Sequence, residues 1–314
     1  MHDTSCFYNE ELKNRFINDK SEEIISVTSM YYMFKKVAKI ETELNKDLCD
    51  WNYYEIMEYY KLLNCSSIQP LIIINAIFSQ YTQFCLMNNI VKDSQNHYTE
   101  VKREILIKCI NKLILDKKCV DREQVLTWID ELPNPKDQFI MLGVFEFGKR
   151  RNYYDIANAK PEDVDLRNCT LKLENRTVKI SEKLAEIIKD CMSTNYYFSV
   201  SGSFLKRMPL IYDGHIVKKY PNEEIKSTDY AKGRNIYQSL TRSFKYLGVE
   251  KWMNGVALVN SGKIYSINQK AKELNISGRD VINSDHIKEI NNQYDSNIEI
   301  NARTFILQYE DYLA

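Results

Sequence analysis

The chain has 314 residues, enough for two domains of ordinary size, and its 43 Lys and Arg residues balance its 43 Asp and Glu residues. This balance excludes a protein that is strongly basic or acidic as a whole, so affinity for a polyanion depends on where the charges lie. No uninterrupted apolar run approaches the roughly 20 residues that a membrane span requires. The cysteines form no C-x-x-C pair and no histidine stands at zinc spacing, which predicts reduced thiols in the cytoplasm, no metal site and no cofactor.

Residues 1–117 are predicted to form a bundle of four or five helices. Apolar residues recur at intervals of three and four over 21–39, and Ser21 is the expected cap of that helix. The most apolar helix of this half is expected over 68–88. The other helices are expected over 53–63 and 98–115, with a polar loop at 92–96.

Residues 118–314 are predicted to form a second domain that is mainly helical and contains one small β-sheet. Asp121, Asp137 and Ser181 are the expected caps, because each precedes an apolar periodic segment. Alternation at period two indicates a hairpin over 163–180. Helices are expected over 121–132, 138–147, 154–159, 182–192, 235–247, 256–274, 281–292 and 301–313.

Charge is segregated within this second domain. Residues 204–279 carry 14 basic and 6 acidic side chains, whereas residues 280–314 carry 2 basic and 7 acidic ones. The basic stretch combines an expected loop over 202–234 with a basic helix over 235–247. A local excess of this size is the electrostatic footprint of a protein that binds a polyanion, so we expect this helix to face DNA.

The order of parts over 121–165 resembles the tyrosine recombinase (phage integrase) family. A capped helix, a Pro/Asn turn and a buried helix lead to Gly148, then to two arginines and the acidic-aliphatic pair Asp155-Ile156. The resemblance implies a helical core-binding-like (SAM-like) domain followed by a catalytic-like domain. Arg150 is the nearest match to the first catalytic arginine of the family, and Arg151 is the alternative.

The resemblance also implies which side chains the chemistry would need. In the family a tyrosine hydroxyl attacks the scissile phosphate, while two arginines and His or Lys donors stabilise the transition state. The His-x-x-Arg box of the family falls on Ala257 and Asn260, so both functional side chains are missing. His286 and Tyr294 resemble the second histidine and the nucleophile. An alternative alignment places Arg242 in the missing box.

Several positions leave more than one interpretation open. Arg150 follows a buried helix, so its guanidinium is expected either to contact a phosphate or to form an ion pair within the fold. Tyr294 is one of 22 tyrosines, and packing is the ordinary role of such a side chain. The hairpin lysine of the family has approximate matches in Lys172 and Lys179.

The favoured hypothesis is a sequence-specific DNA-binding protein on an inactive recombinase scaffold, resembling the repressors of SPβ-like Bacillus prophages, which maintain lysogeny. Its expected partners are operator DNA and a phage-encoded antagonist or co-repressor, in the cytoplasm of a bacterial host at the nucleoid. The alternatives are a divergent, active integrase that performs strand transfer and a protein-interaction module. The predicted DNA contacts are Ser66, Lys149, Arg150, Arg151, Lys206, Arg207, Arg234, Arg242, Lys245 and Lys263.

Overall fold

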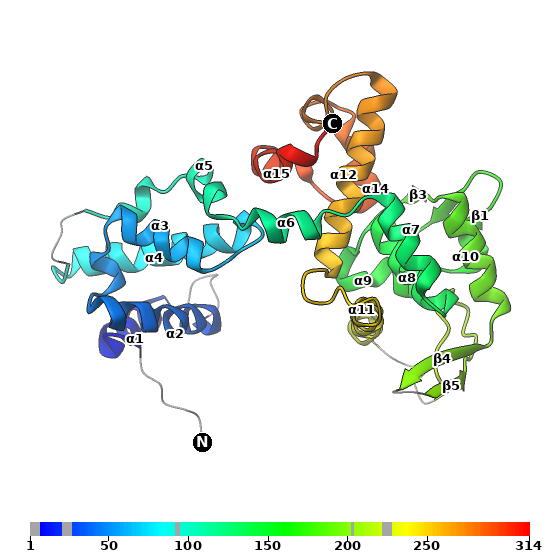
Figure 1. Cartoon of the computed structure of the whole chain (residues 1–314), viewed down its shortest axis with the longest axis horizontal. Coiled ribbons are helices and arrows are strands. Elements are labelled where there is room, and N and C mark those ends of the chain that lie inside the picture. The colour runs from blue at the N-terminus through cyan, green and yellow to red at the C-terminus, as the bar shows by residue number, and fades with distance from the viewer. Residues whose placement is uncertain (1–6, 21–26, 92–94, 202–203, 222–227) are drawn as a thin grey trace. The chain divides into compact units, whose positions relative to one another are not determined.

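The computed structural model describes residues 7–20, 27–91, 95–201, 204–221 and 228–314 (Figure 1). The chain divides into two compact units, 1–115 and 116–314. Most of the described chain is helical, and its named strands belong to two small antiparallel sheets in the second unit. The predicted class, mainly α with a small amount of β structure, is confirmed.

The first unit is a helical bundle around an aromatic core. Phe34 packs edge-on against Phe16 and Tyr81, with ring centroids 6.0 and 5.2 Å apart, and all three side chains are fully buried. Such edge-to-face pairs stabilise a core beyond the apolar area that they bury. The elements are α1 (Glu10–Asp19), α2 (Val27–Leu44), η1 (Leu48–Asp50), α3 (Tyr53–Leu62), α4 (Ile68–Met87), η2 (His97–Glu100), α5 (Arg103–Leu106), η3 (Ile107–Cys109) and α6 (Lys112–Lys118).

Helix α4 runs through this core. By length and composition it could cross a membrane, with a mean hydropathy of 1.2 over its most apolar window, although polar residues interrupt its apolar runs. Its side chains Leu71, Ile77 and Phe78 are fully buried within the first unit. One face of α4 therefore packs against other elements of the same unit, whereas Ile73 and Met87 on its other side are exposed.

The predicted single helix over 98–115 is wrong. The segment is broken into η2, α5, η3 and α6, and the backbone at Ile110 is extended. The amide of the next residue, Asn111, donates to the Cys65 carbonyl at 2.7 Å, and its side chain accepts from the Ile114 amide at 3.1 Å. This local capping competes with continuation of the helix. The predicted cap Ser21 and part of the predicted loop at 92–96 lie outside the described residues.

Helix α8 (Pro135–Phe147) is the centre of the second unit. Its side chains Phe139, Leu142 and Val144 are fully buried, and α10, α11 and α12 pack around it. The other elements are α7 (Arg122–Glu131), α9 (Arg150–Asn158), η4 (Pro161–Asp163), β1 (Val164–Asp165), β2 (Thr170–Lys172), β3 (Thr177–Lys179), α10 (Glu182–Ser193), β4 (Tyr196–Ser201), β5 (Phe204–Pro209), α11 (Asp229–Tyr246), α12 (Gly255–Leu274), α13 (Gly278–Ile282), α14 (Ile287–Tyr294), η5 (Ile298–Asn301), α15 (Ala302–Tyr309) and η6 (Glu310–Tyr312).

The second unit contains two sheets rather than the predicted one. Strands β1, β2 and β3 form an antiparallel sheet in which buried Leu171 stands opposite buried Val178, as the hairpin prediction requires. Strands β4 and β5 form a second antiparallel pair, with Tyr197 opposite Met208. The expectation of a loop from residue 202 onward is wrong for β5, because Phe204–Pro209 pairs with β4 residue by residue.

The caps of this unit are partly as predicted. Asp121 and Ser181 cap α7 and α10, each accepting a hydrogen bond from the backbone amide three residues later. The prediction for Asp137 is wrong, because α8 begins earlier, at Pro135, whose fixed φ suits the first turn of a helix. Asp137 is instead buried in that turn and accepts a 2.6 Å hydrogen bond from the Ser239 hydroxyl.

Several predicted helices have different limits in the structure. Helix α9 begins at Arg150 instead of residue 154, and α11 begins at Asp229, where the Thr228 side chain caps it, instead of residue 235. The predicted helix over 281–292 is split into α13 and α14. At the break, the Ser284 hydroxyl donates to the Val281 carbonyl, which replaces the continuing helical hydrogen bonds.

Two glycines let helices of the second unit approach each other closely. A Cβ atom at Gly262 would lie 1.8 Å from the Phe145 carbonyl oxygen, so α12 meets the backbone of α8. A Cβ atom at Gly233 would lie 2.0 Å from the Asn152 carbonyl oxygen, which sets α11 against α9. These contacts hold in place the two helices that carry the predicted basic face and the predicted remnant of the catalytic box.

Candidate nucleic-acid interface

Arg150 opens α9 and is held by acidic side chains. The turn from α8 passes through Gly148, whose φ of 89° suits glycine best. Nitrogens of the Arg150 guanidinium lie 3.3 Å from Asp155, 3.0 Å from Glu174 and 3.3 Å from Asp295. The Arg150 side chain is 6% exposed. Of the two roles that the sequence left open for Arg150, the structure contains the ion pair.

Arg176 completes this network from the turn between β2 and β3. Its Nη1 lies 2.7 Å from Asp155, and its Nη2 donates to the Phe147 carbonyl at 3.2 Å. We call the two arginines and their three carboxylates (Arg150, Arg176, Asp155, Glu174 and Asp295) the Arg150 network. Its formal charge is −1, so a phosphate would meet a cluster whose cations are already neutralised.

The predicted matches to the hairpin lysine of the family lie outside this network. Lys172 and Lys179 are exposed, on β2 and β3. The turn between the strands carries Glu174 and Arg176, which belong to the Arg150 network. Arg176 was missed as a structural residue, because its position in a polar turn gives no sign that it is buried.

Tyr294 is a core residue in this structure. Its side chain is 4% exposed, and its hydroxyl donates to the Phe145 carbonyl at 2.9 Å and lies 3.0 Å from the Ser266 hydroxyl. Burial raises the pKa of Tyr294 well above its ordinary value. A nucleophile has to reach its substrate and lose a proton, and this environment opposes both.

The remaining positions matched to catalytic residues lie on α12, at the start of α14 and on α11. Ala257 is buried in α12, and the amide of Asn260 donates to the Tyr309 hydroxyl at 2.8 Å. His286 is half-buried at the start of α14. The alternative candidate, Arg242, lies on the exposed face of a different helix, α11. Ala257 and Asn260 therefore add no positive charge to the Arg150 network.

The other predicted cations have a different environment from Arg150. Within the described parts of the chain, no carboxylate lies within ion-pair distance of Lys149, Lys206, Arg207, Arg234, Arg242, Lys245 or Lys263. A cation without an acidic partner keeps its attraction for an external anion, whereas a neutralised one has largely lost it. The structure thus separates a neutralised arginine cluster from a set of basic side chains that can serve a polyanion.

Helix α11 presents several of these cations in one row. Arg234, Arg242 and Lys245 are exposed, and together with exposed Gln238 they recur at intervals of four, four and three residues. This spacing places them along one stripe of the helix. We call these four residues the α11 stripe. Arginine and glutamine are side chains that read base edges in a major groove, so this helix can supply both phosphate contacts and base contacts.

Lys149 and Lys263 form a second basic site, beside the start of α9. Burial and then the charge of Lys149 lower the pKa of Lys263 to about 8. The ammonium of Lys149 lies 5.8 Å from the centre of the Tyr153 ring. Two lysines whose positive charges repel each other would be stabilised by an anion placed between them.

The β4–β5 hairpin carries a third basic site. Arg207 is exposed and its guanidinium stacks 3.7 Å from the centre of the Tyr196 ring, while the adjacent Lys206 is also exposed. Because neighbouring residues of a strand point to opposite faces, these two cations lie on different sides of the hairpin. The prediction placed both in a loop, because Phe204–Pro209 does not alternate at period two, and only its pairing with β4 identifies it as a strand.

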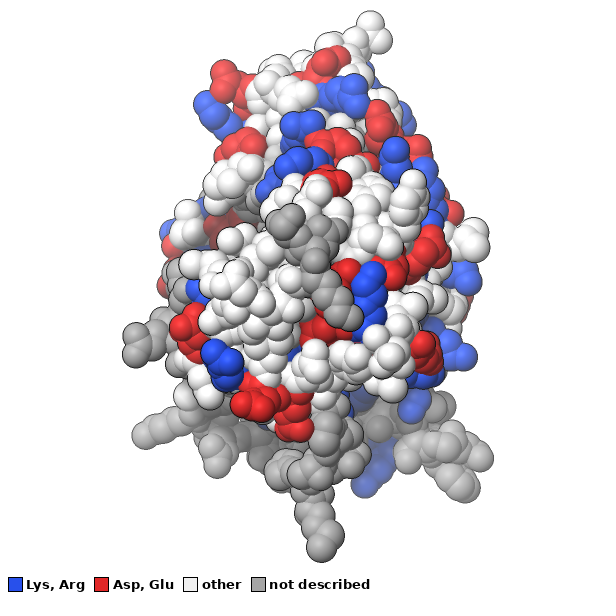
Figure 2. All heavy atoms as spheres, turned by 90° about the vertical axis from the view of Figure 1, so that its left-hand side faces the viewer, with Lys and Arg blue, Asp and Glu red and all other residues white. Residues whose placement is uncertain are grey.

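One face of the first unit carries charges of both signs. On the face of the molecule seen from the side of α1 to α5, basic and acidic side chains are interspersed, so that face presents no field of a single sign (Figure 2). The predicted contact Ser66 is half-buried in the turn before α4. The side chain of Arg151, in the second unit, lies outside the described residues.

Comparison with known families assigns both units. The family model described as "MrpR, C-terminal catalytic domain" matches residues 119–313, and the model described as "MrpR, N-terminal core-binding domain" matches residues 7–87. These matches confirm the predicted tyrosine-recombinase-like order of a helical core-binding domain and a catalytic-type domain. A search of curated proteins finds no match.

Solved structures that resemble the chain include a recombinase and two integrases of low sequence identity. The XerA recombinase is 12% identical, with a TM-score of 0.40 over 96% of this chain and 97% of that one. A lambda integrase dimer bound to a COC′ core site is 12% identical, with a TM-score of 0.47 over 94% of each chain. The Tn1549 transposon integrase in complex with circular intermediate DNA is 13% identical, with a TM-score of 0.42 over 93% of this chain and 97% of that one.

Proposed function

The chain belongs to the MrpR family, and from that premise we propose that it is a sequence-specific DNA-binding protein whose recombinase-type scaffold holds DNA without cutting it. In this proposal it is a prophage transcriptional repressor that maintains lysogeny, acting at operator sites in the cytoplasm of a bacterial host. A phage-encoded antagonist or co-repressor would control its occupancy of those sites.

One contrast carries the proposal. In the Arg150 network, acidic side chains neutralise Arg150, the arginine that best matches the first catalytic arginine of the family. The cations of the α11 stripe, in contrast, have no carboxylate within ion-pair distance among the described residues. Phosphoryl transfer depends on positive charge at the reacting phosphate. DNA binding without cleavage needs cations along the backbone and side chains in a groove, and the second arrangement supplies these.

In the proposed mode of binding, α11 lies in the major groove. Arg234, Arg242 and Gln238 would contact base edges, and Lys245 would contact a phosphate. The β4–β5 hairpin, with Lys206 and Arg207, and the pair Lys149 and Lys263 would hold the sugar-phosphate backbone on either side. Contacts to phosphate supply affinity in every sequence, and contacts to bases supply the preference for an operator.

The test uses the full chain and DNA fragments recovered by footprinting on the host genome. We expect a protected site with no covalent adduct when that site is offered as a nicked suicide substrate, which traps a phosphotyrosyl intermediate. A covalent adduct that disappears in Tyr294→Phe would overturn the proposal in favour of an active recombinase. Absence of any protected site would favour a protein-interaction module instead.

A further inference from the structure

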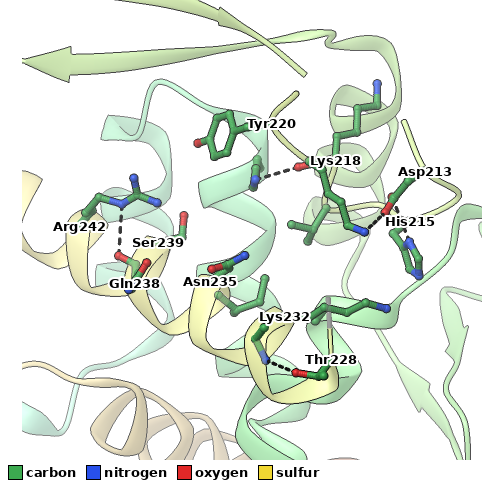
Figure 3. Close-up of a pocket in the computed structure, with 16 residues that line it drawn as sticks. Asp213, His215, Lys218, Tyr220, Thr228, Lys232, Asn235, Gln238, Ser239 and Arg242 are labelled. Atoms are coloured by element: carbon green, nitrogen blue, oxygen red, sulfur yellow. Dashed lines mark hydrogen bonds and ion pairs between the residues drawn. The ribbon is translucent and has the colours of Figure 1, made fainter. Parts of the chain in front are cut away.

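A pocket of about 490 Å³ lies beside α11 in the second unit. Figure 3 shows Lys232, Asn235, Ser239 and Arg242 along the side of α11 that faces the segment 213–220. Lys136, from the first turn of α8, also lines this pocket. The pocket is of the size that takes a small molecule rather than a single ion.

The walls of the pocket are positively charged. Its lining includes Lys136, Lys219, Lys232 and Arg242, and the acidic group among the described lining residues is Asp213, which pairs with Lys219 at 2.8 Å. Lys232 donates to the amide oxygen of Asn158 at 2.7 Å, and Arg242 donates through Nε to the Gln238 carbonyl at 3.3 Å. Both of these acceptors are neutral, so the charges of Lys232 and Arg242 are not compensated by them.

Part of the lining of the pocket is apolar. Ala157, Val217 and Ile236 contribute to it, and Asn235 and Gln238 add amide groups to the lining. Such a surface suits an uncharged ring with hydrogen-bonding edges, while the cations of the lining suit a dianionic group on the same molecule. A mononucleotide combines these two features in a molecule of the right size.

We propose that this pocket binds a free phosphate ester of mononucleotide size, and that binding there opposes DNA binding. The coupling follows from Arg242, which lines the pocket and also belongs to the α11 stripe. A ligand phosphate that binds the Arg242 guanidinium removes it from DNA, and by linkage DNA lowers the affinity for the ligand by the same factor. The coupling rests on the proposed function, whereas the ligand site does not.

Calorimetry on the full chain without DNA tests the site. The probes are adenosine 5′-monophosphate, adenosine and inorganic phosphate, and we expect the monophosphate to bind at least about tenfold more tightly than either fragment. Ala231→Trp fills the pocket without changing charge and should abolish binding. Lys232→Gln should weaken it by about tenfold, and the exposed Lys251→Gln, outside the pocket, should not.

Equal binding of the monophosphate to wild type and Ala231→Trp would overturn the ligand site, as would equal binding of adenosine and the monophosphate. Competition with labelled operator DNA then tests the coupling, and a DNA affinity that does not change with saturating monophosphate would overturn it. If the wild-type protein does not bind the monophosphate while Ala231→Trp has a lower affinity for DNA, the pocket binds a DNA phosphate instead. Failure to bind any DNA would overturn the proposed function and the coupling, and calorimetry would still decide the ligand site.

Discussion

The folded chain disfavours the charged form of the Lys263 side chain. The pKa of Lys263 is lowered to about 8 in the folded chain from an ordinary value of 10.5. Between about pH 8 and pH 10.5, Lys263 is therefore protonated in the unfolded chain and deprotonated in the folded chain. The free energy of unfolding contributed by this group therefore rises with pH across that window. We expect Lys263→Met to raise stability at pH 7 and to flatten this rise, measured by urea unfolding from pH 7 to pH 10.

The same substitution is expected to weaken DNA binding, because the ammonium that costs stability is available for a phosphate. Lys251→Met, at an exposed position, is the matched control and should change neither quantity. A loss of stability in Lys263→Met would contradict this assignment, since it would mean that the charge is compensated within the fold.

Arg150 is expected to act on stability rather than on DNA. Arg150→Ala leaves Glu174 and Asp295 beside buried Asp155, whose remaining partner is Arg176. We expect a loss of roughly 3 kcal/mol, at the low end of the range for breaking a buried ion pair, because two of the three acids are half-exposed. Thermal unfolding measures the loss, and Arg167→Ala, at an exposed arginine of the same unit, is the control. Reduced DNA binding per folded molecule with unchanged melting would instead assign Arg150 to phosphate contact.

At the scale of an element, the α11 stripe should divide into base-reading and phosphate-contacting residues. We expect Arg242→Ala to cost about 1–3 kcal/mol of operator affinity and to relax the preference at one base pair. Lys245→Ala should weaken binding to all sequences alike and reduce the salt dependence by about one phosphate contact. Binding isotherms on the operator and on single-base variants measure both. A uniform loss in Arg242→Ala would place its guanidinium on the backbone.

The close approach of α12 to α8 and α9 makes a second test at this scale. Gly262→Ala would place a Cβ atom 1.8 Å from a backbone carbonyl, and Gly255→Ala would place one 2.0 Å from the Tyr153 hydroxyl. Overpacking of this kind typically costs about 1–3 kcal/mol. We expect Tyr153→Phe to recover part of the loss in Gly255→Ala, since it removes the clashing oxygen, and to recover none in Gly262→Ala. Equal recovery in both variants would mean that the helices move apart freely.

At the scale of the whole molecule, the salt dependence of DNA binding should increase with the number of cations that contact phosphates and lack acidic partners within the fold. Replacing Lys206 and Arg207 together with alanine should reduce the slope of log affinity against log salt by about 1, since the two side chains lie on opposite sides of the hairpin, one of them faces the DNA backbone, and each phosphate that is no longer neutralised accounts for roughly 0.9. Arg150→Ala should leave the slope unchanged when affinity is expressed per folded molecule, since the Arg150 network is already neutralised. A fall in slope for Arg150→Ala would show that the network opens when DNA binds.

The sequence predicted the local features of this protein well. Asp121 and Ser181 cap the helices expected of them, and the strands β1 to β3 pair as their alternation requires. These features are readable because capping and periodicity involve residues only a few positions apart. The prediction of one helix over 98–115 was wrong for a related reason. The hydrogen bond at the break joins Asn111 to Cys65, and a periodic pattern within the segment contains no information about a contact so far away along the chain.

The sequence by itself determined the family resemblance, the segregation of charge, and the presence of Ala257 and Asn260 at the positions that the resemblance matches to the catalytic box, because each is a property of residue identity or order. The tertiary structure alone decided what surrounds Arg150. Asp155, five residues further along the same helix, is one of the three acids that neutralise it. The other two come from a hairpin turn and from the end of α14, and no spacing rule links those positions to Arg150. Whether a cation is neutralised or free to bind an anion depends on which side chains the fold brings within a few ångströms, since electrostatic attraction follows distance in space and not distance along the chain.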